Sequence, residues 1–124
     1  MKYINNQILG ISQTLQTVNI EEINTKTAYW VSRNLRIISV VGTEFEKLQA
    51  DIRNDKWFKE LQTDVGIIGQ EKAELKWKEQ LETSNNELKD YLSKETDIEF
   101  YKVSIDDLNI PSKIIPLVMD LISE

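Results

Sequence analysis

Histidine and cysteine are both absent from this chain. Without cysteine, the chain has no disulfide framework, no zinc–thiolate site and no thiol nucleophile. Without histidine, it lacks the usual near-neutral general base, the imidazole metal ligand and the catalytic triads built on that residue. Carboxylates, lysines and hydroxyls remain, and no constellation of them has the spacing of a catalytic site. The sequence therefore predicts a protein that is not an enzyme and that carries no metal and no cofactor.

Long hydrophobic runs are missing as well. No stretch approaches the roughly 18 consecutive apolar residues of a membrane span, and the apolar runs are short, such as Ile37-Ile38 and Val40-Val41. The first 20 residues carry one charged side chain, Lys2, and are interrupted by Asn, Gln, Ser and Thr. We therefore expect no signal peptide. These features predict a cytoplasmic protein with no membrane partner.

Helix breakers are scarce, because the chain has only four glycines and two prolines. Their scarcity favours helices over most of its length. The 124 residues suit one domain, and 40% hydrophobic with 29% charged residues is a globular balance. The predicted fold is mainly α, with residues 1–124 forming a single helical domain.

The spacing of apolar residues predicts three helices. Residues 5–18 carry one apolar stripe, and residues 31–52 and 70–93 carry two longer, heptad-like stripes. Thr25 or Thr27 can cap the second helix. The two long helices, joined by a middle segment of about 20 residues, predict a long antiparallel hairpin. We expect its two stripes to bury each other, with Leu35, Ile38, Phe45 and Leu48 packed against Trp77, Leu81 and Leu88.

The pattern changes near the C-terminus. Residues 98–105 are β-branched and aromatic and alternate in polarity, which predicts a short strand. A lone strand needs a partner, and two remain open: residues 2–4 of the same chain or another subunit. After a turn, a short closing helix is predicted, with Ser112 as its cap. Its core-facing residues would be Ile115, Val118, Met119 and Ile122.

Two interpretations of the apolar stripes remain open. They pack inside one monomer, or part of them serves self-assembly or a partner helix. The N-terminal helix has an almost uncharged outer face, and arginine beside aromatic residues is a common interface composition, although the arginines also fit a solvated face. We expect a homo-oligomer that forms through the N-terminal helix or the strand edge. The candidate protein-interaction residues are Ile8, Ile11, Leu15, Trp30, Arg33, Arg36, Trp57 and Phe58.

Charge is concentrated at the C-terminus. The net charge is −6, and residues 95–124 hold seven acidic residues against two lysines. This acidity fits mimicry of nucleic acid toward a basic partner, and it equally fits a role in solubility. The acidic pairs Glu21-Glu22 and Asp106-Asp107 are interpreted as solvated turns, since adjacent carboxylates on a loop do not converge. An acidic chain without a basic run does not favour direct nucleic-acid binding.

The segment IEFYKVSIDDLNIPSKIIPLVMDLISE, residues 98–124, resembles small uncharacterised proteins of tailed phages of Gram-positive, low-GC hosts. In those proteins a strand with an acidic turn, here Asp107-Leu108, leads into a short closing helix. The resemblance implies a non-catalytic protein-binding or assembly accessory protein, similar to tail-assembly chaperones, in the host cytoplasm. Its alternative is an anti-defence inhibitor that binds and occludes a host enzyme. The resemblance supplies no functional residues.

Overall fold

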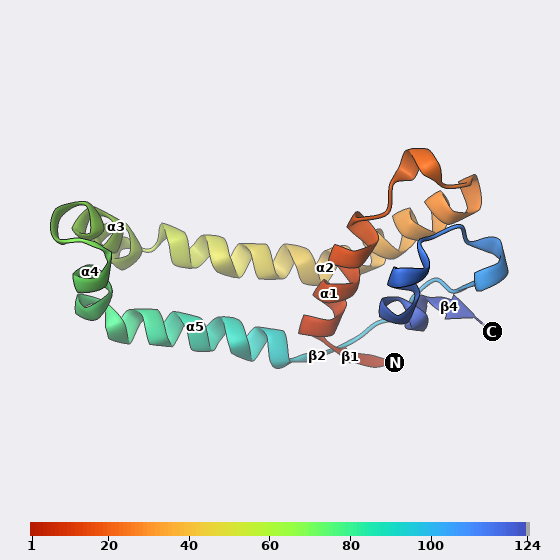
Figure 1. Ribbon diagram of the computed structural model, residues 1–124. Coiled ribbons are helices and arrows are strands. Elements are labelled where there is room, and N and C mark those ends of the chain that lie inside the picture. The colour runs from red at the N-terminus through yellow and green to blue at the C-terminus, as the bar shows by residue number, and fades with distance from the viewer. Residues whose placement is uncertain (124) are drawn as a thin grey trace. The chain divides into compact units, whose positions relative to one another are not determined.

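The computed structural model describes residues 1–123, except the side chain of Ile20, and its fold is mainly α (Figure 1). The sequence predicts a single domain, and the described residues pack as two compact units. The terminal unit comprises Met1–Gly42 and the chain from Glu95 onward, whereas the hairpin unit comprises Thr43–Lys94. One long helix contributes residues to both units.

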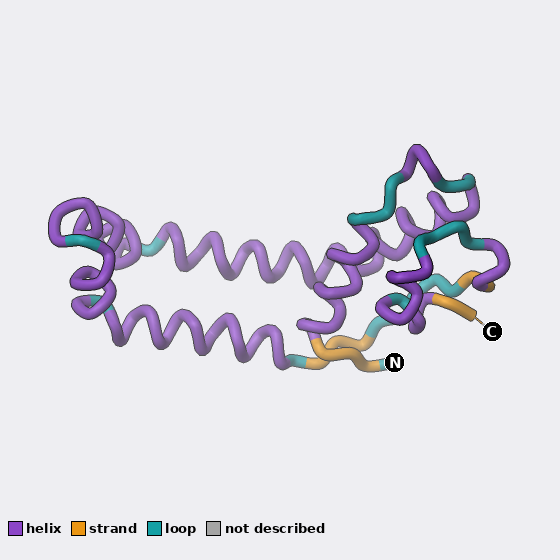
Figure 2. The backbone as a smooth tube through the Cα atoms, in the orientation of Figure 1, coloured by secondary structure: helices purple, strands orange, loops and turns teal. Residues whose placement is uncertain are grey.

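Helices dominate the chain, and the strands are very short (Figure 2). The α-helices are α1 (Asn5–Gln16), α2 (Thr25–Asn54), α3 (Lys56–Ile68), α4 (Gln70–Lys76) and α5 (Lys78–Ser93). The 3-10 helices are η1 (Ile20–Glu22), η2 (Ile105–Asp107), η3 (Ser112–Leu117) and η4 (Met119–Leu121). The strands are β1 (Lys2–Ile4), β2 (Glu95–Asp97), β3 (Val103–Ser104) and β4 (Ile122–Ser123).

Nearly all the fully buried apolar residues lie in the terminal unit. The predicted stripe of α1 is confirmed as a core face, since Ile8 and Leu15 are completely buried. The first part of α2 packs into the same core through Trp30, Val31, Ile38 and Val41. The C-terminal segment adds the buried residues Ile98, Phe100, Val103, Ile114, Val118 and Leu121.

One face of α2 supplies hydrogen bonds to the irregular C-terminal segment. The Asn34 amide donates to the Tyr101 carbonyl oxygen at 2.9 Å, and its oxygen accepts from the Tyr101 amide at 2.8 Å. Trp30 Nε1 donates to the Leu121 carbonyl at 2.8 Å. The Asn109 amide donates to Thr27 Oγ1 at 3.0 Å. These side chains satisfy backbone groups that no regular ladder pairs.

The start of α2 differs from the predicted capping. Asn24, rather than Thr25 or Thr27, is the capping residue, because Asn24 Oδ1 accepts from the Thr27 amide at 2.8 Å. The Asn24 amide in turn donates to Asn109 Oδ1 at 2.9 Å. The cap is thereby joined to the C-terminal segment, a long-range contact that local sequence does not reveal.

The strand prediction is only partly correct. Residues 2–4 do form a strand, but this strand, β1, pairs antiparallel with β2, just before the predicted strand, so the expected pairing of residues 98–105 with residues 2–4 is wrong. The Ile98 amide continues the contact by donating to the Met1 carbonyl at 2.9 Å. Of residues 98–105, only Val103–Ser104 form a strand, which pairs parallel with β4. Residues 98–102 are irregular because the Tyr101 backbone bonds to Asn34 instead of to a neighbouring strand, and Ile105 begins η2.

The predicted closing α-helix is instead a pair of 3-10 helices, η3 and η4. Pro116 lies inside η3, where its ring and missing amide prevent a continuous α-helical ladder. Ser112 provides no cap, since the N-terminal position is Pro111. The tighter winding also changes the buried face. Val118 is buried as predicted, whereas Met119 is 57% exposed, and Ile115 and Ile122 are only partly buried.

The hairpin unit has two arms, defined here as residues 43–54 of α2 and helix α5, which α3 and α4 connect (Figure 1). The predicted helix over residues 70–93 is interrupted at Trp77, whose φ of −104° and ψ of 21° separate α4 from α5. Between α3 and α4, Gly69 has a φ of 89° and a ψ of 161°. That backbone conformation is accessible almost only to glycine.

The stripes of the arms are less buried than the heptad pattern predicts. Leu61 of α3 and Ala73 of α4 are buried, but none of the described residues of α5 is. Phe45, Leu48, Leu81 and Leu88 are all partly exposed. The expected mutual burial of the two stripes is therefore wrong, and within the predicted set only Ile38 is buried, as part of the terminal unit.

Replacing Asn34 by alanine should destabilise the protein by about 2–3 kcal/mol, because two partly buried backbone groups of Tyr101 lose their partner. The control Asn86→Ala, at an exposed position of α5, should leave stability unchanged or slightly increased. Urea unfolding followed by far-UV circular dichroism measures both. A loss below about 0.5 kcal/mol for Asn34→Ala would show that Tyr101 finds other partners.

A matched pair of leucines tests where the core lies. Leu15→Ala removes a completely buried side chain and should cost about 2–5 kcal/mol. Leu81→Ala, in the partly exposed stripe of α5, should cost less than about 1.5 kcal/mol. The same urea experiment compares them, and equal losses would mean that the arms bury each other in solution.

Candidate functional site

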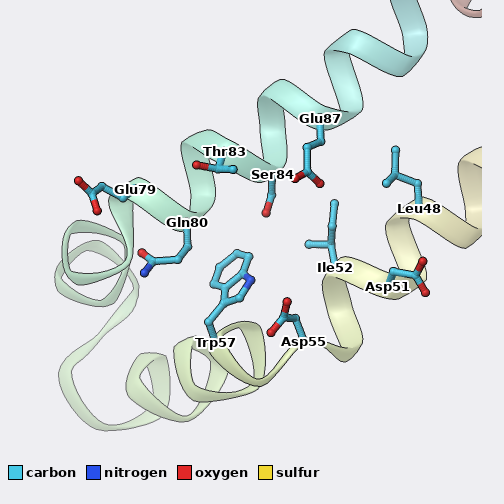
Figure 3. A pocket seen from close by; sticks show the side chains of 10 residues that line it. All are labelled: Leu48, Asp51, Ile52, Asp55, Trp57, Glu79, Gln80, Thr83, Ser84 and Glu87. Atoms are coloured by element: carbon cyan, nitrogen blue, oxygen red, sulfur yellow. The ribbon is translucent and has the colours of Figure 1, made fainter.

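An open cleft of about 530 Å³ lies between the two arms (Figure 3). Figure 3 shows Ile52 and Trp57 on one wall and Gln80 and Ser84 on the other, with their side chains directed into the space between the helices. The apolar part of the lining comes from the downstream half of the α2 stripe and from Trp57. The full lining is Leu48, Asp51, Ile52, Asp55, Trp57, Glu79, Gln80, Thr83, Ser84 and Glu87.

A second cleft of about 470 Å³ adjoins the first and lies nearer the ends of the arms that lead out of the hairpin unit. The two share Leu48, Asp51 and Glu87, so together they form one groove along the arms. We call it the hairpin groove. The second cleft is also lined by Glu44, Lys47, Asp90, Tyr91 and Lys94.

An aromatic pair holds the arms together at one end of the groove. The rings of Phe45 and Tyr91 are stacked, with centroids 5.8 Å apart and an interplanar angle of 16°. Tyr91 Oη donates a hydrogen bond to Glu44 Oε2 at 3.1 Å. Partial burial, and then this hydrogen bond and the charge of Glu44, raise the pKa of Tyr91 to about 12. This end of the groove is therefore defined by a specific contact between the arms.

A second aromatic cluster closes the other end. Trp57 contacts Phe58 and Trp77, with ring centroids 5.6 and 6.4 Å away. Trp77 Nε1 donates to Asp64 Oδ2 at 2.8 Å, and Lys76 Nζ lies 3.0 Å from the same oxygen. The hydrogen bond from Trp77, with that from Lys76, lowers the pKa of Asp64. The interruption between α4 and α5 thus places Trp77 where it anchors α3.

Negative charge predominates in the groove. The first cleft contains four carboxylates, from Asp51, Asp55, Glu79 and Glu87, and its lining includes no lysine or arginine. None of these four takes part in an ion pair within residues 1–123. In the second cleft, Lys47 and Lys94 face a larger number of carboxylates. The groove therefore combines partly exposed apolar side chains with an uncompensated acidic rim.

Half of the predicted interaction residues lie in the core. Ile8, Ile11, Leu15 and Trp30 are buried within the terminal unit, so they cannot form an exposed contact surface. The physical reason is that α1 packs its apolar stripe on its own chain, which leaves its uncharged polar face outward. The sequence pattern alone did not distinguish this packing from an intermolecular one.

The other four predicted residues are at least partly exposed. The Arg33 guanidinium lies 4.3 Å from the Tyr101 ring centroid, and its Nη1 donates to Tyr29 Oη at 3.4 Å, so it is held by aromatic neighbours. Arg36 is exposed elsewhere on α2. Trp57 lines the first cleft, whereas Phe58 packs beside it outside the lining. Of the eight predicted residues, only Trp57 belongs to the groove.

Sequence reasoning missed the acidic rim. Asp51 and Asp55 are about 30 residues from Glu79 and Glu87 in sequence, and only the hairpin brings them together. One signal of the groove was present in the sequence. Ser84 interrupts the apolar stripe of α5, as expected for a position that does not face a tightly packed core.

No protein family, curated protein or solved structure matches this chain. None of the helices formed by residues 1–123 combines the length and apolar character that crossing a bilayer requires. Over the same residues, no three carboxylates converge in a way that could hold a metal ion.

The Tyr91 phenol should ionise near pH 12, against about 10 for an ordinary tyrosine. Because the folded-state pKa is raised, its stabilising contribution is complete below about pH 10 and is lost as the pH rises toward 12. Ultraviolet titration of the phenolate band, with Tyr91→Phe subtracted, isolates this group. Glu44→Gln should lower the pKa only part of the way, since burial is the larger cause. A Tyr91 pKa near 10 would mean that the arms separate at this end.

Proposed function

We propose that this protein is a non-catalytic protein-binding protein that assists assembly, and that the hairpin unit is its binding element. The observation that carries the proposal is the hairpin groove, where the apolar side chains of Leu48, Ile52 and Trp57 stay partly exposed. A contiguous exposed apolar surface with a polar rim is typical of interaction sites. The role would be that of a tail-assembly or morphogenesis chaperone in a phage-infected cell, acting in the host cytoplasm.

The two arms do not fully bury each other's apolar side chains. Each amphipathic helix needs its apolar face buried. The arms contact each other through Phe45 and Tyr91 at one end, and an open cleft remains between them farther along. A third helix lying in the groove would bury Leu48, Ile52 and Trp57. Binding a helix from a structural protein before its assembly is the activity of an assembly accessory protein.

The alternative proposal is an anti-defence inhibitor that occludes a host enzyme, with its acidic residues imitating nucleic acid. Its support is the excess of carboxylates in residues 95–124. Two of them are already engaged, since Asp97 lies 2.8 Å from the N-terminal amine and Asp107 lies 3.1 Å from Lys26. The groove is the better-supported binding element, because the four carboxylates of its first cleft form no ion pair with any residue that the structure describes.

Site-specific photo-crosslinking in the organism that encodes the chain tests the proposal. Benzoyl-phenylalanine at position 83, where Thr83 lines the groove, should crosslink one defined protein. The same group at position 86, where Asn86 is exposed on α5 outside the lining, should not. The purified partner should then bind wild type at least about tenfold more tightly than Leu48→Asp, because a charge in the apolar lining opposes burial.

Circular dichroism of Leu48→Asp is the control, and it should show the same helix content as wild type. Absence of a crosslinked protein at position 83, or equal crosslinking from both positions, would overturn the proposal. Turnover of a small-molecule substrate by the purified protein would also overturn the proposal, because it would establish catalysis.

A further inference from the structure

The chemistry of the groove points to one class of occupant. Resting on the proposed function, we propose that the hairpin groove binds a cationic amphipathic helix of a different protein, with apolar residues on one face and lysine or arginine along its edges.

The shape of the groove fits a helix. One wall is the end of α2 with the start of α3, and the other is α5 with the residue after it. The two adjoining clefts extend along residues 44–57 on one side and 79–94 on the other. Helix α5, which has 16 residues, is about 24 Å long at 1.5 Å per residue. A partner helix of similar length therefore spans both clefts. Its side chains at helical spacing of three and four would meet Leu48, Ile52 and Trp57 in turn.

The rim determines the charge of that helix. Covering the first cleft removes water from Asp51, Asp55, Glu79 and Glu87, and no lysine or arginine of the lining compensates them. Dehydrating a carboxylate without a counter-charge is unfavourable, so an acidic or wholly apolar helix would be rejected. Lysine or arginine at the edges of the occupant would pair with these groups and accelerate its association. The same charge opposes anionic lipid surfaces and nucleic acids.

A second copy of this chain is a poorer occupant. A symmetric dimer through the groove would place the two acidic rims beside each other. The second cleft does not reverse this, because Lys47 and Lys94 are outnumbered by Glu44, Asp51, Glu87 and Asp90. The N-terminal helix, which would be the obvious apolar donor, has its stripe buried in its own unit. Charge therefore favours a partner of opposite sign.

Synthetic peptides provide a direct test with the full chain. The probe is an 18-residue peptide of leucine and lysine with leucines at helical spacing, amidated and acetylated. One control keeps the leucines and replaces every lysine with glutamate, and another has the leucine–lysine composition in scrambled order. Titration calorimetry should show that the probe binds at least about tenfold more tightly than either control, and binding should weaken as salt rises. Amide chemical shifts should change at groove residues.

Matched charge variants locate the interaction. Asp51→Asn with Glu87→Gln removes two carboxylates shared by both clefts and should weaken probe binding about fivefold or more. Glu46→Gln with Glu82→Gln removes the same charge from exposed positions that do not line the groove, and should change it less than twofold. Equal effects of the two pairs, or equal binding of the leucine–glutamate peptide, would overturn the proposal.

Two further outcomes separate this inference from the proposed function. Light scattering that shows a dimer at about 100 μM, dissociated by Leu48→Asp, would assign the groove to a second copy and overturn the cationic helix. A crosslinked partner at position 83 that contacts the groove through an acidic or non-helical segment would overturn this inference alone. Failure of crosslinking at position 83 would overturn the proposed function as well.

Discussion

The hydrogen bonds from one face of α2 to the C-terminal backbone are the constraint on which the terminal unit depends. Residues 98–121 form only short 3-10 helices and a two-residue strand, so amides and carbonyls between these elements have no ladder partner. Thr27, Trp30 and Asn34 lie on successive turns of one face of α2 and provide the partners. Because these bonds hold an irregular segment in place, its scattered apolar residues can complete a core that α1 and α2 leave open.

A single apolar stripe on α2 meets two different environments. Upstream of Gly42, Val31, Ile38 and Val41 are buried because α1 and the C-terminal segment cover them. Downstream, Leu48 and Ile52 face only one other helix and stay partly exposed. The burial of a helix face is thus decided by how many elements surround it. For the same reason, only the downstream residues of this stripe are exposed enough to contact a partner.

Sequence patterns predicted what depends on local periodicity. The mainly α fold, the hairpin and the buried face of α1 follow from apolar spacing, and Trp57 was singled out by its chemistry. Long-range hydrogen bonding lay beyond such reasoning, which is why the bonds of Asn34 and the irregular backbone after Ile98 were missed. Pro116 was visible in the sequence, but its effect on a short helix was underestimated. The acidic rim was hidden because its members converge only after the chain reverses.

The chain reverses direction between the arms, and Gly69 is required there for its backbone conformation and not for its small size. Gly69 has open space around the position a Cβ atom would occupy, so no neighbour excludes a larger residue there. Its φ of 89° with a ψ of 161° is nonetheless a conformation that L-amino acids avoid, because of their own backbone. The mirror-image side chain of a D-amino acid would suit it. The way in which the carboxylates of α2 and α5 face each other across the groove is therefore linked to a glycine whose backbone conformation has the opposite hand to that of ordinary residues.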